Sequence, residues 1–324
     1  MPLEVVVVDN ASTDGTRGIL KEFQGRLRVI YNHSNTGFAE AQNRAIGASA
    51  AEWVLTLNPD VLMQPGFIRS LVEAGEADPG AGAVCGKLLS IGAGFEPLPD
   101  ARVDSTGIFF TPAMRHFDRG WHEPDNGAFQ NMEYVFGASA AAALFRRRMI
   151  DDIAVDGEFF DPRFFVCRED ADVAWRAQLL GWRCIYTPLA EAYHVRTVTP
   201  QNRRSLPAII NMHSVKNRFL MRIKNGTTGL YRRHWLAMTL RDLMVLGGSL
   251  FWEPSSLADY WHLARSLPKA LRQRQQIMAR KKVSDEVINQ WFSFEPAARP
   301  ISESYQLSVV GCQLSVVSRA GDAT

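Results

Sequence analysis

The opening of the chain alternates between apolar runs and helix-like segments, and the apolar runs end in polar residues. LEVVVVDNASTDGT leads to Asp9 and a glycine-containing turn, and WVLTLNPDV leads to Asn58 and Asp60. Continuous apolar runs are typical of interior strands, and this alternation is typical of βαβ units. Ligands of open α/β sheets bind outside the carboxyl ends of the strands. The sequence therefore predicts an α/β fold with a mostly parallel sheet flanked by helices, and a crevice near Asp9 and Asp60.

An acid-rich stretch follows between Phe159 and Val195. Glu169, Asp170 and Asp172 stand where FFDPRFFV gives way to VAWRAQLLGW, which has the periodicity of a helix with one buried side. Acidic residues in the first turn also complement the helix dipole, so this stretch can be an ordinary helix start. If the acids face the crevice, Asp170 is the first candidate for a general base and Asp172 the second. If Asp172 points along the helix, we expect it to pair with Arg176 at i+4.

Two further positions are candidates for ligand contact. Asp60 supplies an oxygen ligand that suits Mg²⁺ or Mn²⁺, and His194, after the strand WRCIYTP, would favour Mn²⁺. Taken alone, a histidine at such a position is more often an ordinary histidine than a metal ligand. Gly137, Ala138 and Ser139 are small enough for a ligand to approach the backbone, although tight packing uses small residues more often.

The charge is unevenly distributed along the chain. The overall formal charge is +2, yet residues 192–284 contain 17 Lys or Arg against Asp242, Glu253 and Asp259. A basic segment joined to an acidic body indicates either a polyanionic neighbour, such as lipid headgroups or pyrophosphate, or a solvated basic face. No nucleic-acid-reading motif accompanies the charge, so we expect no nucleic-acid partner.

The composition is that of a globular protein in a reducing compartment. The four cysteines have neither CxxC nor zinc-type spacing, and the start has no signal-peptide pattern. The longest apolar runs are too short to span a bilayer. We therefore expect a cytoplasmic protein, with peripheral contact at the inner face of the cell membrane as a further expectation.

The C-terminal part has a different pattern. Residues 200–295 are predicted to form a basic helical extension, in which the segment from Leu230 to Trp252 has an amphipathic face. Apolar rings beside arginines suit an interfacial helix and an ordinary bundle equally well. Residues 296–324, in which QLSVV occurs twice, are predicted to be a disordered tail, and residues 1–199 to be the main domain.

Six motifs, in order over roughly the first two thirds of the chain, resemble family 2 glycosyltransferases with the GT-A fold, especially a rhamnosyltransferase-like branch. They are VVVVDNASTDGT, NTGFAEAQNRAI, LTLNPDV, FGASAAAALFRR, FFDPRFFVCREDADVAWRAQLLGW and YHV. The resemblance implies Asp170 as the catalytic base, with Asp172 beside it, and Asp60 and His194 as metal ligands. It also implies a nucleotide-sugar site formed by Asp9, Asn10, Asp14, Asn43, Asn58 and Ser139.

Three departures from the family pattern stand out. The DxD-like position reads Asn58-Pro59-Asp60, which offers one carboxylate, and Gln42 stands where many relatives have arginine. The family pattern also begins with another apolar strand. We therefore expect the first strand to be missing, which exposes the edges of its neighbours unless another segment fills the gap.

The function implied by this resemblance is an inverting, metal-dependent glycosyltransferase of cell-surface polysaccharide synthesis. Its donor would be dTDP-rhamnose or a UDP-sugar, its acceptor a glycan or polyprenyl-linked glycan, and its cofactor Mn²⁺ or Mg²⁺. The alternative is a catalytically impaired, truncated remnant that binds membrane or glycan. A nucleotidyltransferase is disfavoured because no Gly-rich phosphate loop lies near the start.

Overall fold

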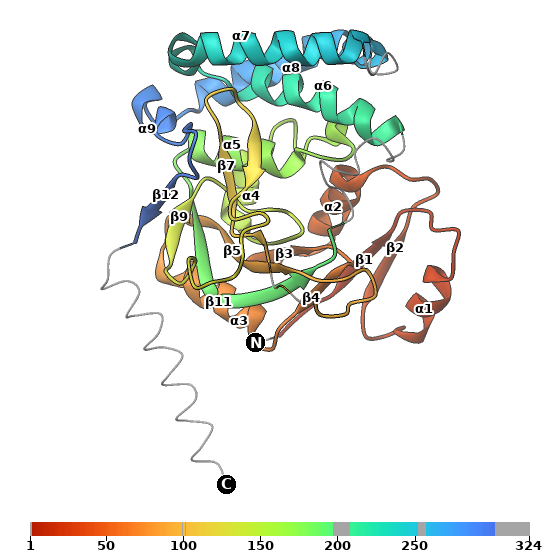
Figure 1. The fold of residues 1–324 in the computed structure, drawn as a ribbon. Helices are drawn as coiled ribbons and strands as arrows, with labels where there is room; N and C mark the ends of the chain where they lie inside the picture. Colours follow the sequence, from red (N-terminus) through yellow and green to blue (C-terminus); the bar gives the residue numbers. More distant parts are fainter. Residues whose placement is uncertain (1, 99, 101, 197–207, 252–256, 302–324) are drawn as a thin grey trace.

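The computed structural model describes residues 2–98, 100, 102–196, 208–251 and 257–301. The chain forms an α/β body beneath a layer of long helices, which Figure 1 shows at the top of the molecule. The expected boundary between residues 199 and 200 lies outside the described residues, as does most of the expected tail. Residues 298–300 of that tail form a short strand of the main sheet.

The main sheet is mixed, with the strand order β12-β9-β11-β5-β10-β3, and with β4 on β11 and β6 on β5. β5 and β11 are parallel, whereas β10 runs antiparallel to both β5 and β3. The expectation of a mostly parallel sheet is therefore wrong, because an antiparallel neighbour needs no helical crossover and the sequence pattern does not fix strand direction. The strands are β3 Trp53–Leu57, β4 Val61–Met63, β5 Ala81–Ser90, β6 Val103–Ser105, β9 Glu133–Val135, β10 Ala142–Arg146, β11 Arg183–His194 and β12 Ala298–Pro300.

The first two strands form a separate parallel pair. β1 (Val6–Asp9) pairs with β2 (Arg28–Tyr31), and α1 (Thr16–Glu22) and α2 (Phe38–Gly47) follow them in turn. Among the described strands, β1 pairs only with β2 and β3 only with β10. Each of the two strands therefore has one hydrogen-bonding edge that no described strand covers.

A layer of helices and aromatic side chains supports the sheet. Trp175 of α5 (Glu169–Leu179) is fully buried, and its ring lies 5.1 Å from those of Phe110 and Phe292. Phe110 belongs to the hairpin of β7 (Ile108–Phe110) and β8 (His116–Asp118), which rises toward the upper helices in Figure 1. The remaining helices are α3 Phe67–Ala77, α4 Arg147–Ile153, α6 Ala208–Asn225, α7 Thr228–Phe251, α8 Leu257–Ala279 and α9 Asp285–Asn289.

Buried polar contacts fasten the helical extension to the body. The side-chain amide of Asn217 on α6 donates to the carbonyls of Phe164, Val166 and Cys167, in the loop before α5. Lys224, also on α6, donates to Asp161 at 2.8 Å and to Asp172 at 3.0 Å. Buried polar groups are stable only when they are paired, so these contacts fix α6 against the start of α5.

We expect Lys224→Met to lower the free energy of unfolding by about 3–5 kcal/mol, because it leaves two buried carboxylates short of a counter-charge. The matched control is Lys282→Met, whose ammonium lies 3.2 Å from Asp152 and is 59% exposed. That change should cost less than about 1 kcal/mol. Urea unfolding of both variants at neutral pH makes the comparison, and equal losses would contradict the anchoring role of Lys224.

Candidate functional site

Asp60 and His194 meet where β4 pairs with β11. His194 is opposite Val61 in this antiparallel pair, and the Val195 amide donates to the Asp60 carbonyl at 3.0 Å. The two side chains face each other, with His194 Nε2 lying 3.5 Å from Asp60 Oδ1. This oxygen is buried and has no hydrogen-bond partner among the described residues. The predicted pair of metal ligands therefore lies together in the fold.

Asp104 on β6 orients the imidazole of His194. Its Oδ2 lies 2.8 Å from His194 Nδ1, which leaves Nε2 directed at Asp60. Burial would raise the pKa of Asp104, but the hydrogen bond from His194 and the nearby Arg196 guanidinium lower it. An ionised Asp104 holds the imidazole with Nδ1 protonated, which leaves Nε2 as the nitrogen able to bind a metal.

Arg196 connects Asp104 and His194 to a second carboxylate, that of Asp118. The Nη2 of Arg196 donates to Asp104 at 3.1 Å and to Asp118 at 2.8 Å. Asp118 lies near enough to Asp170 that burial and the Asp118 charge together raise the pKa of Asp170. The predicted base and the predicted metal ligands therefore belong to one electrostatically connected cluster.

Asp170 is half-buried at the first turn of α5. Its Oδ2 accepts from the Ala140 amide at 3.4 Å, and its Oδ1 accepts from the Ala171 amide at 2.7 Å. The loop that contains Ser139 therefore lies against this carboxylate. Because its raised pKa still leaves a carboxylate at neutral pH, the group has the properties of a general base.

Asp172 has a different environment from Asp170. Its side chain is fully buried and accepts from Arg176 at 3.0 Å, from Lys224 and from Asn225. The i+4 pairing with Arg176 is thus confirmed. With its oxygens engaged in the core, Asp172 is placed to support α5, whereas Asp170 is half-buried and contacts the Ala140 amide.

Most of the residues predicted to bind the nucleotide make hydrogen bonds that fix loops within the protein. Asp9 is buried and accepts from Arg17 at 2.6 Å and from the Ser12 amide at 3.1 Å. Burial would raise the pKa of Asp9, but these hydrogen bonds lower it. Asn10 joins the loop of residues 32–37, and Asn43 joins α2 to Phe160.

The remaining predicted contacts differ in accessibility. Asp14 is exposed and accepts from the Thr16 amide at 3.0 Å. Asn58 and Ser139 are half-buried, and Asn58 adjoins Asp60 at the end of β3. The structure thus brings Asn58, Asp60, Ser139, Asp170 and His194 toward one region, and it places the others on the side of β1 and α2.

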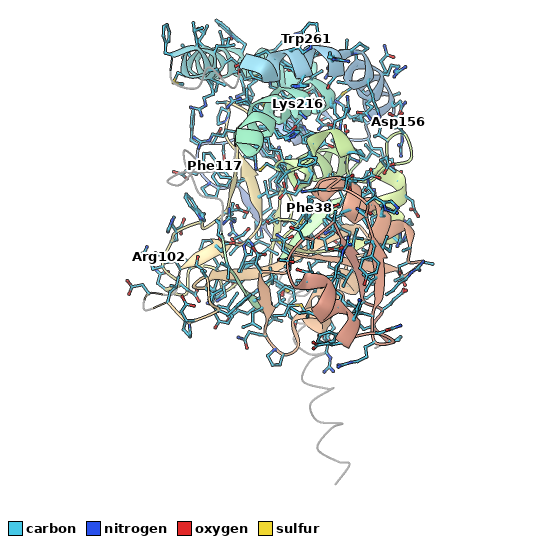
Figure 2. The ribbon with its side chains drawn as sticks, turned by 90° about the vertical axis from the view of Figure 1, so that its right-hand side faces the viewer. Phe38, Arg102, Phe117, Asp156, Lys216 and Trp261 are labelled. Carbon is cyan, nitrogen blue, oxygen red and sulfur yellow. The ribbon has the colours of Figure 1, made fainter. Side chains whose placement is uncertain are left out.

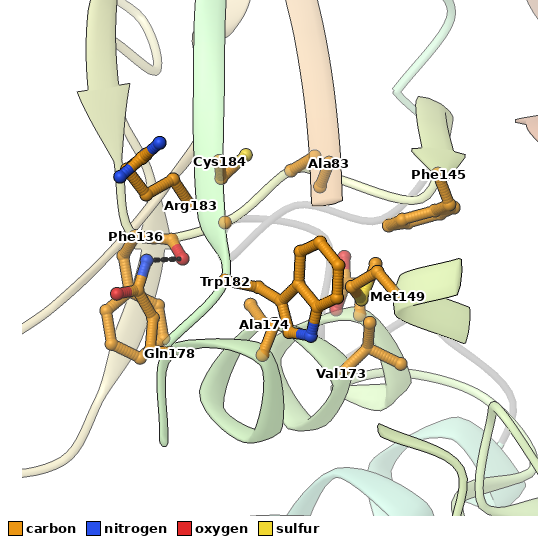
Figure 3. Close-up of a pocket in the computed structure, with 14 residues that line it drawn as sticks. Ala83, Phe136, Phe145, Met149, Val173, Ala174, Gln178, Trp182, Arg183 and Cys184 are labelled. Carbon is orange, nitrogen blue, oxygen red and sulfur yellow. Dashed lines mark hydrogen bonds between the residues drawn. The ribbon is translucent and has the colours of Figure 1, made fainter. Parts of the chain in front are cut away.

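Gly137 explains why the 137–140 loop lies so near α5. A Cβ at this position would stand 2.1 Å from the Ala174 Cβ, so the residue serves close packing. Figure 3 shows the apolar pocket behind this contact, with Trp182, Met149 and Phe145 around it. The Gln178 amide donates to the Phe136 carbonyl at 2.9 Å and ties α5 to the same wall. The helix that carries Asp170 is therefore held in place by this close packing and this hydrogen bond.

Three residues of the cluster were missed by the sequence analysis: Asp104, Asp118 and Arg196. Asp104 and Asp118 lie in very short strands within a Gly- and Pro-rich region, where no periodicity marks a functional position. The sequence signal that could have indicated this cluster was Arg196, which lies two residues beyond His194. Its two carboxylate partners come from more than 75 positions away, which no local pattern reveals.

Comparisons with known proteins agree with this architecture. The structure of GalNAc-T7 with UDP, GalNAc and Mn²⁺ has a TM-score of 0.52 to this chain at 12% identity. The match covers 68% of this chain and 41% of that one. This likeness confirms the expected GT-A fold.

Residues 1–153 match the family described as Glycosyl transferase family 2, so this part of the chain belongs to that family. A relative from Mycobacterium tuberculosis, an N-acetylglucosaminyl-diphospho-decaprenol L-rhamnosyltransferase, is 30% identical over 216 residues. That alignment covers 60% of this chain, which spans 66% of the relative. The succinoglycan biosynthesis protein ExoO of Rhizobium meliloti is 26% identical over 95% of this chain and 86% of its own length. The expected resemblance to family 2 glycosyltransferases is therefore confirmed.

Glu169 gives a pH-dependent test of the site's environment. It is buried, its Oε2 has no hydrogen-bond partner among the described residues, and burial and Asp170 raise its pKa above the ordinary 4.5. Because the folded state holds this proton more tightly than the unfolded state, the contribution of Glu169 to stability is lost as pH rises through the raised pKa. We expect Glu169→Gln to be more stable than the wild type, by a margin that grows above pH 4.5. Urea unfolding over a pH series, with exposed Glu22→Gln as control, measures the margin; a constant margin would contradict the assignment.

Proposed function

We propose that this chain is an inverting, metal-dependent glycosyltransferase that transfers a sugar, rhamnose in the first instance, in bacterial cell-surface polysaccharide synthesis. The observation that carries the proposal is Asp170, a half-buried carboxylate of raised pKa within the cluster of Asp118, Arg196, Asp104 and His194. The rhamnosyltransferase from M. tuberculosis supports the choice of sugar and of a diphosphate-lipid acceptor. The donor would be dTDP-rhamnose or a UDP-sugar.

The residues around Asp60 fit a divalent metal, Mn²⁺ or Mg²⁺. Asp60 Oδ1 is buried with no hydrogen-bond partner among the described residues, and His194 Nε2 is held toward it by Asp104. A carboxylate oxygen with an imidazole suits Mn²⁺ best. No cluster of three such ligands occurs in the described part of the chain, so the donor's diphosphate and water would complete the shell. When bound, such an ion neutralises the diphosphate of the leaving nucleotide.

The proton transfer in this mechanism belongs to Asp170. Its carboxylate takes the proton of the acceptor hydroxyl as the hydroxyl oxygen bonds to the anomeric carbon and the nucleoside diphosphate leaves from the opposite side. The Ala140 and Ala171 amides that donate to Asp170 fix its orientation. Asp172 and Arg176 keep the first turn of α5 in place from within the core.

We expect purified protein with Mn²⁺ to transfer from one member of a nucleotide-sugar panel, and EDTA to abolish the reaction. Asp170→Asn should lower the rate by about 10²–10⁴-fold, because it removes the base. The acid limb of the wild-type pH profile should lie above the ordinary aspartate range, since only the unprotonated carboxylate accepts the proton. Asp151→Asn on α4, which changes the same chemical group at an exposed position outside the site, is the control. Full activity of Asp170→Asn would overturn the mechanism, and a chain that binds no nucleotide would favour the remnant.

We also propose peripheral contact with the cytoplasmic face of the membrane through α7. None of the helices among the described residues is long and apolar enough to cross a bilayer. The outer face of α7 nevertheless exposes a row of large apolar side chains, and Trp261 of α8 lies at the same end of the molecule (Figure 2). The row comprises Trp235, Leu236, Leu240, Leu243, Met244, Leu246, Leu250 and Phe251. Such a face suits a helix that lies in the plane of the interface.

Leu243→Glu should weaken binding to vesicles of phosphatidylcholine and phosphatidylglycerol at least about tenfold, because one buried leucine contributes about 1.5–3 kcal/mol. Ile19→Glu on α1 is the matched control, since Leu243 is 61% and Ile19 58% exposed. Co-sedimentation with the vesicles measures both variants. Equal effects of the two changes would show that α7 is not the contact surface.

A further inference from the structure

An arginine cluster lies where the β7–β8 hairpin meets α6 and α7. We define it by Arg115 on the hairpin, Arg168 before α5, Arg218 on α6 and Arg241 on α7. Arg168 donates from Nη1 to His116 Nδ1 at 2.9 Å and from Nε to the Ser214 carbonyl at 3.2 Å. Figure 2 shows Phe117, the neighbour of His116, just below the helix that carries Lys216. The cluster thus draws on four separate parts of the chain.

Arg218 is the buried member of this arginine cluster. Its side chain is 5% exposed, and its Nε has no hydrogen-bond partner among the described residues. Its Nη2 lies 3.4 Å from the Ala113 carbonyl and 3.8 Å from Asp242. Asp242, however, is already paired with Arg222 at 3.0 and 2.6 Å. Arg218 is therefore a buried cation, and the carboxylate that lies near it among the described residues is shared with a closer guanidinium.

The electrostatic effects of the cluster are consistent with this shortage of negative charge. Burial and the positive charges of Arg168 and Arg241 lower the pKa of Arg218 to about 9. Burial and the charges of Arg168 and Arg115 also lower the pKa of His116, which stays neutral and accepts from Arg168. Gathering like charges costs free energy in the absence of a counter-ion. Guanidinium groups arranged in this way favour a phosphate or diphosphate.

The members of the arginine cluster adjoin two parts of the chain that the proposed function uses. Arg168 directly precedes Glu169 and the proposed base Asp170, whereas Arg241 belongs to α7, the helix with the exposed apolar face. A lipid-linked acceptor has the same order of parts, namely a sugar, a diphosphate and an apolar chain. The arginine cluster is the part of the protein that matches the diphosphate.

We propose that Arg168, Arg218 and Arg241, together with Arg115, bind the diphosphate of a lipid-linked acceptor and so place its sugar hydroxyl at Asp170. The proposal rests on the proposed glycosyltransferase function for the identity of the ligand. The binding of a diphosphate by these four residues is a separate physical claim, and it can be measured without any transfer reaction.

The first experiment titrates inorganic pyrophosphate into the full chain by calorimetry, with EDTA present so that the Asp60 and His194 pair contributes no metal site. We expect binding to the wild type and a loss of at least about tenfold in affinity in Arg218→Gln, because one charge-assisted contact disappears. Arg218→Lys should recover part of it. The matched control is Arg232→Gln, an exposed arginine on α7 that lies outside the cluster. Asp60→Asn should bind like the wild type.

Thermal unfolding separates this role from a merely structural one. Without ligand, Arg218→Gln should unfold at the same temperature as the wild type or higher, since it relieves repulsion within the cluster. Pyrophosphate should raise the unfolding temperature of the wild type more than that of the variant, because the variant binds it at least about tenfold more weakly. If Arg218→Gln does not fold, the half-buried Arg241→Gln takes its place. Absence of pyrophosphate binding to the wild type, or unchanged binding to the folded cluster variant, would overturn the proposal.

A second arm distinguishes the sources of the phosphate. Farnesyl diphosphate should displace pyrophosphate, whereas phosphatidylglycerol vesicles should not. If the vesicles displace it as effectively, the site recognises membrane headgroups and the assignment to an acceptor diphosphate is wrong. In the transfer assay, Arg218→Gln should raise the KM for acceptor and leave the KM for donor unchanged. A chain that transfers no sugar but still binds pyrophosphate through Arg218 would refute the proposed function and leave the diphosphate site standing.

Discussion

The buried carboxylate of Asp172 is the interaction on which the rest of the site depends. Arg176 reaches it from the same helix, and Lys224 and Asn225 reach it from α6. Taking so many polar groups out of water is unfavourable unless each finds its partner, so α5 and α6 are compatible in this one arrangement. The helical extension therefore acts as part of the structure that fixes the first turn of α5, where Asp170 and Arg168 lie.

Three acidic residues within one helical turn illustrate how strongly environment divides chemical roles. Asp172 turns inward to cations, whereas burial and a neighbouring carboxylate raise the pKa of both Glu169 and Asp170. The dipole of α5 favours negative charge at this end, but it acts on all three and cannot distinguish them. What distinguishes them is the partner that each meets in space, and only Asp170 reaches the Ala140 amide and the field of Asp118.

The sequence was informative wherever the chemistry is local. Apolar runs predicted β1 and β3, the acidic residues before VAWRAQLLGW predicted the start of α5, and Asp60 and His194 were both named as candidate metal ligands. The direction of β10 in the main sheet was not predictable, because an irregular segment without periodicity precedes this strand. The partner of His194 was not predictable for a related reason, because Asp104 lies within that segment. Asn10 and Asn43 show that a correctly placed polar residue does not by itself reveal its role. A polar residue beside the end of a strand, or on a helix near the crevice, can equally hold a loop in place.

The charge asymmetry of the sequence takes on a different meaning in the structure. Part of the basic segment meets acids of the body directly: Lys224 pairs with Asp161 and Asp172, Arg280 and Lys282 pair with Asp152, and Lys269 lies near Asp156. These pairs join the two parts of the chain, whereas Arg232, Arg233, Arg265 and Arg272 are exposed to solvent. Arg218 cannot be balanced in the same way, because Asp242, the carboxylate beside it, is held by Arg222. Arg218 thus differs from the exposed arginines, whose charge water solvates, because its guanidinium is buried and the carboxylate beside it is shared. A buried positive charge in this position favours one anionic group at a defined site over general binding of a polyanion.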